Sequence, residues 1–67
     1  MNIGIYRSSF CKLTLVRDGF ATLDAAEEYA RANYRIEYFE RDAYTHHAAD
    51  FLSKDGGVYA IQPTKGA

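Results

Sequence analysis

The sequence predicts a small α+β domain in which one helix packs on one face of an antiparallel sheet of three to five strands, in the order ββαβββ. Three observations lead to this prediction. Residues 23–33 are dominated by strong helix formers. The segments on both sides alternate apolar and polar residues with the period of two that is typical of half-buried strands. Asp55-Gly56 separates two apolar runs, which is a strong hairpin signal.

Two short segments precede the helix. Residues 3–7 have the alternation of a first strand, residues 7–9 are polar enough for a turn or bulge, and residues 10–16 have the pattern of a second strand. The two segments are equally compatible with one bent strand. Residues 17–19 are expected to end it, because Gly19 supplies turn geometry.

The helix is predicted from Leu23 to about Asn33, with Thr22 as its N-cap. At 100° per residue, a charged arc and a mostly alanine arc lie on opposite sides. The charged arc holds Asp24, Glu27, Glu28 and Arg31, and the arc expected to be buried holds Leu23, Ala26, Tyr29, Ala30 and Asn33. Small side chains on the buried arc allow a close approach to a flat sheet.

Three further strands are expected after the helix. Residues 34–39 form the first, with Ile36 and Tyr38 on one face. A loop covers residues 40–49, and residues 50–61 form the hairpin. Pro63 ends the last strand, and we expect residues 1–2 and 64–67 to be frayed.

Length and composition indicate one domain over residues 1–67 with a marginal core. Apolar residues make up 48% of the chain, which is enough for a folded core and far above a disordered composition. A chain this short is usually stabilised by disulfides, a metal or a partner copy. Cys11 is the one cysteine, and we interpret it as a small buried hydrophobe. Oligomerisation is therefore the expected source of extra stability.

Charge and the N-terminal segment bear on partners and location. Eight Lys and Arg are scattered among nine Asp and Glu, so the basic stripe of a nucleic-acid binder is missing. The first residues lack the basic start and apolar run of a signal peptide, and no stretch is apolar enough to span a membrane. With the single cysteine, these features predict a cytoplasmic protein.

Candidate chemistry is sparse, and we predict neither an enzyme nor a bound cofactor. His46 and His47 with Asp50 are the one suggestive metal cluster, but two further ligands are missing and a solvated loop is the preferred interpretation. The serines and Cys11 lack the flanking signature of a catalytic nucleophile.

Six tyrosines exceed what one small core can bury with every hydroxyl satisfied. Tyr and Arg are enriched at protein interfaces, and residues 34–41 carry both. An alternative is that these rings only fill a thin core. The predicted partner-binding residues are Tyr34, Arg35, Tyr38, Glu40, Arg41 and Tyr44.

The segments 20–26, 34–39 and 48–63 give the stretch from Phe20 to Pro63, about two-thirds of the chain, a familiar pattern. This stretch resembles small uncharacterised accessory proteins of bacteria, phages and mobile elements. In size and layout the chain is similar to small phage inhibitors such as anti-CRISPR proteins, which implies action by occupying a partner's surface. The shared motifs are structural, so the resemblance assigns no functional residue.

These features favour a non-enzymatic protein-binding module that pairs with a protein partner, with itself as a homodimer, or with both. Two alternatives stay open. One is a small single-stranded nucleic-acid-binding protein that stacks bases on exposed tyrosines. The other is a metal-dependent enzyme or sensor that uses His46, His47 and Asp50.

Overall fold

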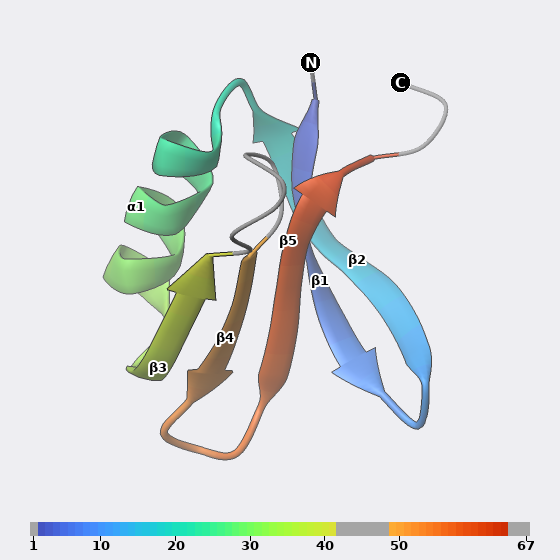
Figure 1. The fold of residues 1–67 in the computed structure, drawn as a ribbon, viewed down its shortest axis with the longest axis vertical. Coiled ribbons are helices and arrows are strands. Elements are labelled where there is room, and N and C mark those ends of the chain that lie inside the picture. The colour runs from blue at the N-terminus through green and yellow to red at the C-terminus, as the bar shows by residue number, and fades with distance from the viewer. Residues whose placement is uncertain (1, 42–48, 65–67) are drawn as a thin grey trace.

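The computed structural model describes residues 2–41 and 49–64, and in these ranges it contains five strands and one helix. The elements are β1 (Ile3–Ser9), β2 (Lys12–Phe20), α1 (Leu23–Asn33), β3 (Ile36–Arg41), β4 (Ala49–Ser53) and β5 (Val58–Pro63). The strands form one antiparallel sheet in the spatial order β2-β1-β5-β4-β3, with α1 beside it (Figure 1). The predicted α+β class and the order ββαβββ are confirmed.

The first and last described strands lie side by side, with Ile5 opposite Ile61. Asn2, which precedes β1, forms hydrogen bonds with Thr64 after β5 and with Gly19 in β2. The Thr64 N–H donates to the Asn2 carbonyl at 2.9 Å, and the Gly19 N–H donates to the Asn2 side-chain oxygen at 2.8 Å. Asn2 and Thr64 were expected to be frayed, and the structure instead places them in this network; residues 1 and 65–67 lie outside the described ranges.

Helix α1 has the predicted bounds and the predicted cap. The Thr22 hydroxyl accepts from the Ala25 N–H at 3.1 Å, which satisfies one of the free donors of the first turn. At the other end, the Tyr34 N–H donates to the Ala30 carbonyl at 2.8 Å while Tyr34 itself is already extended. Of the arc expected to be buried, Tyr29 is half-buried and Asn33 is exposed, so the buried stripe is narrower than predicted.

The core lies between α1 and the face of the sheet that it covers. Buried apolar side chains here include Ile3, Ile5, Leu23, Ala26, Ala30, Ala49, Phe51, Tyr59 and Ile61. The ring of Phe51 stacks on that of Tyr59 with centroids 4.7 Å apart, and Tyr34 lies 4.9 Å from Tyr59. Aromatic pairs at these separations add to the free energy of burial. The alanines of α1 bring its backbone close to this layer.

The N-terminal segment forms two strands, and several of its details differ from the prediction. Phe10 and Cys11 are the two turn residues between β1 and β2, with φ of 49° and 64°. Cys11 is exposed, so the prediction of a buried cysteine is wrong, because the turn directs this side chain away from the sheet. Strand β2 also continues through residues 17–19, because Gly19 at φ 95° accommodates a register shift there.

Strand β3 begins later than predicted and extends further, to Arg41. A register shift lies between Ile36 and Tyr38. An extra residue in one strand reverses the alternation of side chains beyond it. Ile36 therefore packs against the core while Tyr38 faces away from it, so the prediction that these two side chains share one face is wrong.

Candidate functional site

The face of the sheet opposite α1 is the candidate site, and the strand register defines it. Residues directly opposite each other in neighbouring strands point to the same face. One row crosses the five described strands as Tyr38, Leu52, Val58, Ser8 and Leu13. A second row consists of Glu40, Asp50, Ala60, Tyr6 and Leu15. We call these ten residues the open face.

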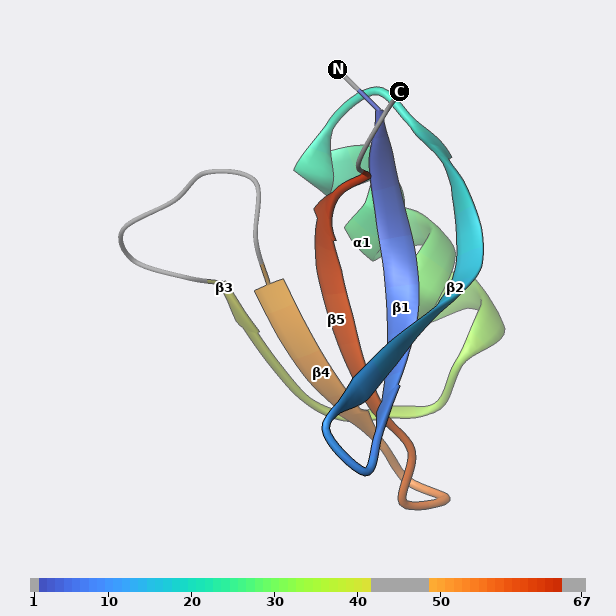
Figure 2. The same ribbon diagram turned by 90° about the vertical axis from the view of Figure 1, so that its right-hand side faces the viewer.

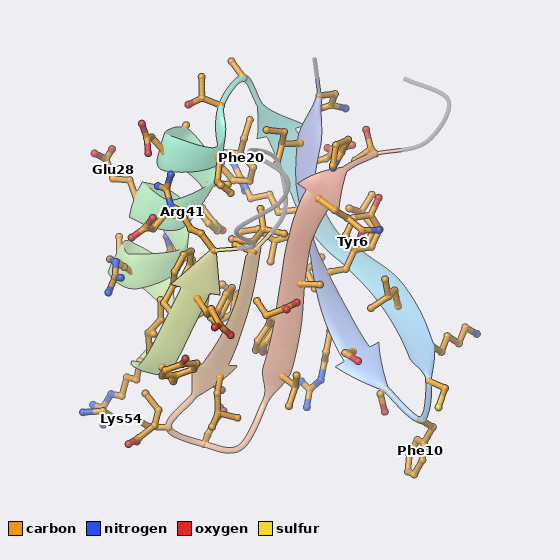
Figure 3. The ribbon with its side chains drawn as sticks, viewed as in Figure 1. Tyr6, Phe10, Phe20, Glu28, Arg41 and Lys54 are labelled. Atoms are coloured by element: carbon orange, nitrogen blue, oxygen red, sulfur yellow. The ribbon has the colours of Figure 1, made fainter. Side chains whose placement is uncertain are left out.

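The open face is apolar for most of its width. Tyr38 is 58% exposed, Val58 47%, Leu15 45%, Leu13 44% and Leu52 37%. Figure 3 shows the direction of this face, because Phe20 lies beside the helix and Tyr6 lies away from it. The solvent side of an antiparallel sheet normally carries polar residues. Contiguous exposed apolar residues of this kind mark binding surfaces.

One corner of the open face is acidic. Glu40 on β3 lies directly opposite Asp50 on β4, and both side chains are exposed. Like charges in direct cross-strand opposition destabilise a sheet. None of the ten residues of the open face is Lys or Arg, so neither carboxylate has a basic neighbour within this set. A cationic group of a binding partner would relieve this repulsion.

The turn between β1 and β2 adds a further exposed apolar group. Phe10 is fully exposed, and Figure 3 shows it at the tip of the hairpin, pointing away from the domain. Phe10 and Cys11 both have positive φ, which costs on the order of 1 kcal/mol for each residue other than glycine. The Phe10 ring thus buries no surface within the described domain, and its backbone conformation lowers the free energy of unfolding.

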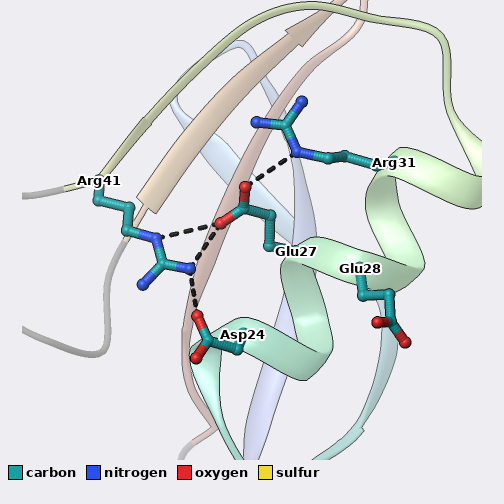
Figure 4. Close-up of a pocket in the computed structure, with 5 residues that line it drawn as sticks. All are labelled: Asp24, Glu27, Glu28, Arg31 and Arg41. Atoms are coloured by element: carbon teal, nitrogen blue, oxygen red, sulfur yellow. Dashed lines mark hydrogen bonds and ion pairs between the residues drawn. The ribbon is translucent and has the colours of Figure 1, made fainter.

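The opposite side of the molecule carries a charged cluster of Asp24, Glu27, Glu28, Arg31 and Arg41, which lines a surface pocket of about 330 Å³ (Figure 4). Arg41, at the end of β3, reaches across to α1. Its Nη2 lies 2.5 Å from Asp24 Oδ1 and 2.6 Å from Glu27 Oε1. Arg31 Nε donates to Glu27 Oε2 at 2.9 Å, which is the predicted i,i+4 pair.

These ion pairs explain the electrostatics of the cluster. The hydrogen bond from Arg41 lowers the pKa of Glu27, and the smaller contribution of Arg31 acts in the same direction against the effect of burial. Both carboxylates raise the pKa of Arg41, Asp24 more than Glu27. The carboxylates of Asp24 and Glu27 are thus paired with the two arginines, and the ion pairs of Arg41 hold the end of β3 against α1.

The six residues predicted to bind a partner are divided between the two sides. Tyr38 and Glu40 lie on the open face. Arg41 is part of the charged cluster. Tyr34 packs against Phe51 and Tyr59, and burial raises the pKa of its hydroxyl.

Of the remaining two residues, Arg35 is exposed, and its carbonyl accepts from the Lys54 N–H at 2.7 Å. Tyr44 lies outside the described residues. The structure thus brings Tyr38 and Glu40 together, and it places Tyr34 and Arg41 elsewhere.

Of the three proposed metal ligands, the structure describes only Asp50. Asp50 is exposed on the open face, and His46 and His47 lie in the segment that the structure does not describe. Within residues 2–41 and 49–64, no group of three His, Cys, Asp or Glu side chains could hold a metal ion. Within the same ranges, no helix has the length and apolar character to cross a membrane.

The aliphatic residues of the open face were not predicted from the sequence to form a binding site. Leu52 and Val58 belong to strands that carry apolar residues on both faces, so alternation alone does not show which side is buried. Leu13 and Leu15 alternate with Lys12 and Thr14 and so share one face of β2, but nothing in the sequence indicated that α1 would leave that face uncovered. The hairpin signal at Asp55-Gly56 predicts that β4 pairs with β5, but it does not give the observed register, in which Ser53 bonds to Gly57 and Leu52 lies opposite Val58.

Comparison of the chain with protein-family models, with curated proteins and with solved structures gave no match.

Proposed function

We propose that this protein is a non-enzymatic module that binds a protein partner through the open face of its sheet. The observation that carries the proposal is the continuous apolar row of Tyr38, Leu52 and Val58, which crosses β3, β4 and β5 on the side away from α1. A chain of 67 residues has few large apolar side chains, and this one leaves several of them in solvent. Burial against a partner would recover about 25 cal/mol for each Å² covered.

The shape and content of the open face favour a protein over other partners. Tyr38 provides a rigid aromatic ring with a polar end, which is typical of residues that dominate binding energies. The acidic corner at Glu40 and Asp50 selects a partner with Lys or Arg at the rim of its interface. The same corner repels phosphates, which disfavours the alternative of a single-stranded nucleic-acid binder.

The mode of action that we propose is occlusion of the partner's own working surface. This mode is suggested by the resemblance of the sequence, in size and layout, to small phage inhibitors, and it needs a binding face but no catalytic group. We place the protein in the cytoplasm, which is supported by the exposed free thiol of Cys11, since such thiols persist in reducing compartments.

The test is a comparison of captured proteins between matched variants. The tagged chain, Leu52→Lys with Val58→Lys, and the control Glu28→Lys are used as bait in a lysate of the source organism. Glu28 is exposed on α1, away from the open face, so the control adds charge without touching the proposed site (Figure 4). Thermal melts establish that each bait is folded.

We expect at least one protein to be captured by the wild-type chain and by Glu28→Lys, and its capture to fall by about tenfold or more with the open-face variant. A tenfold fall corresponds to about 1.4 kcal/mol. A captured protein that is lost equally with both variants would contradict the proposal. So would a set of captured proteins in which none depends on Leu52 and Val58.

A further inference from the structure

The two edges of the sheet differ in how they are protected. At one edge, β3 carries the charged residues Glu37, Glu40 and Arg41 and a register shift, all of which discourage pairing with another strand. At the other edge, β2 has register shifts opposite Ile3–Tyr6, in its second half. Its first half, residues 12–15, is regular and contains one charge, at Lys12. This half of β2 is an unprotected edge.

The outer edge of β2 presents free backbone groups at defined positions. Ser9 and Lys12 flank a two-residue turn, so they form a hydrogen-bonded pair with their backbone groups directed at each other. Antiparallel pairs alternate, and therefore the N–H and C=O groups of Leu13 and Leu15 point away from β1. In the part of the chain that the structure describes, β2 pairs with β1 alone. Figure 2 shows β2 beside β1, with its end near the turn crossing in front of β1.

Residues 12–16 are self-complementary about Thr14. If a second copy of β2 lies antiparallel with Thr14 opposite Thr14, then Leu13 of each copy lies opposite Leu15 of the other. Leu13 and Leu15 form hydrogen-bonded pairs in this register, which uses the outward N–H and C=O groups on both strands. Lys12 lies opposite Val16, so the register sets no like charges against each other.

Pairing of the two edges also buries the side chains that β2 exposes. Residues 12–19 are exposed, whereas β1, β4 and β5 each contain buried residues. Leu13 is 44% and Leu15 45% exposed, and both would pack against their counterparts on the open face. A two-fold interface in which the same residues serve both copies is the commonest form of a small oligomer.

We propose that the protein forms a homodimer by antiparallel pairing of β2 with β2 of a second copy, with the two-fold axis at Thr14. The two sheets become one sheet of twice the width, and the two open faces join across Leu13 and Leu15. The partner-binding proposal rests on Leu52, Val58 and Tyr38, which lie on the other side of β1, so the two proposals stand or fall separately.

The charge pattern of the register gives a test that discriminates this dimer from others. In Leu13→Lys with Leu15→Lys, like charges face each other across the two-fold, and in Leu13→Lys with Leu15→Glu, opposite charges do. Light scattering of the full chain over the micromolar to millimolar range measures the molar mass. We expect a dimer for the wild-type chain, a monomer for the first variant and a dimer again for the second.

The outcomes are distinct. A wild-type chain that is monomeric throughout the range overturns the proposal. A dimer that survives Leu13→Lys with Leu15→Lys but is lost with Leu52→Lys and Val58→Lys overturns the proposal and places the interface on the part of the open face that β4 and β5 form. Failure of the oppositely charged variant to restore the dimer contradicts the register about Thr14.

A cross-link tests the same axis without relying on affinity. In the proposed register, Thr14 of one copy and Thr14 of the other form a non-hydrogen-bonded pair. The Cα atoms of such a pair lie about 4.5 Å apart, which is close enough for a disulfide. Thr14→Cys in a Cys11→Ser background should therefore form a covalent dimer on mild oxidation. Lys54→Cys in the same background is the control, because Lys54 lies at the β4–β5 turn and should not cross-link.

Discussion

The two hairpins of this sheet are built in different ways. In the β4–β5 hairpin, Gly56 has a φ of 96°, and the buried Ser53 hydroxyl accepts from the Gly57 N–H at 3.0 Å and donates to Asp55. The β1–β2 hairpin turns through Phe10 and Cys11, both with positive φ and both exposed. The β4–β5 turn is stabilised by hydrogen bonds of its own side chains. The β1–β2 turn has a backbone conformation that residues other than glycine disfavour.

This difference bears on the proposed pairing of β2 with a second copy. Strained backbone that persists in a fold is concentrated at functional positions. The β1–β2 hairpin combines such a turn with the exposed side chains of Leu13 and Leu15, whereas both strands of the β4–β5 hairpin contribute to the core. Substitutions in the two turns test this comparison through their effects on stability. They are given from the largest expected effect to the smallest.

The largest effect is expected at Gly57. A Cβ at this position would lie 2.8 Å from Tyr59 Cε1 and 2.9 Å from Ser53 Oγ, and both of those residues are buried. Gly57→Ala should therefore lower the free energy of unfolding by about 1–3 kcal/mol, as overpacking does in other cores. Urea denaturation followed by circular dichroism measures the change.

The control for this prediction lies beside the other turn. Ser9 is exposed and borders the β1–β2 turn, so Ser9→Ala should change stability by less than about 0.5 kcal/mol. If the two variants were equally stable, the β4–β5 turn would not have the structural role that its contacts indicate.

A smaller effect, of opposite sign, is expected at the β1–β2 turn. Phe10→Asn with Cys11→Gly installs the residues that two-residue turns with positive φ prefer. The free energy of unfolding should rise by about 1 kcal/mol, which raises the melting temperature by about 4–8 °C for a domain of this size. Cys11→Ser alone retains the strained conformation and should give no such gain. A destabilised double variant would show that the ring of Phe10 contributes to folding.

The sequence was sufficient for much of the fold, for reasons that these hairpins illustrate. Asp55-Gly56 and the Thr22 cap are local signals whose geometry is nearly independent of the rest of the chain, and both predictions are confirmed. The Phe10–Cys11 turn has no local signal, because it forms against the preference of its residues. The bulge that separates Ile36 from Tyr38 is likewise set by pairing with β4 and not by local sequence.

The candidate site was less accessible from the sequence. Tyr38 and Glu40 were predicted as binding residues from composition, and the structure places them on the open face, but the interaction itself stays a prediction. Leu52 and Val58 were not singled out, because a strand with apolar residues on both faces does not reveal which face α1 will cover. That information lies in the packing of α1 against the sheet, which involves residues far apart in the chain.

The smallest effect concerns the charge of Asp55. The hydrogen bond from the Ser53 hydroxyl, and after it the bond from the Gly57 N–H, lower the pKa of Asp55 below its ordinary value of 3.8. A carboxyl group whose pKa is lower in the folded state stabilises the fold fully above the ordinary value, and this contribution disappears as the pH falls through the folded value. Asp55→Asn can still accept both hydrogen bonds, so it removes only the charge.

The wild-type chain should therefore melt at a higher temperature than Asp55→Asn at neutral pH, and the difference should vanish as the pH falls below 3.8. A titration of the Asp55 carboxyl by NMR measures the pKa directly. In Ser53→Ala the largest cause of the shift is removed, so the pKa of Asp55 should return toward its ordinary value. An unchanged pKa in Ser53→Ala would mean that the Gly57 N–H alone holds the charge, and that the Ser53 hydroxyl serves the β4–β5 turn only through its bonds to Gly57.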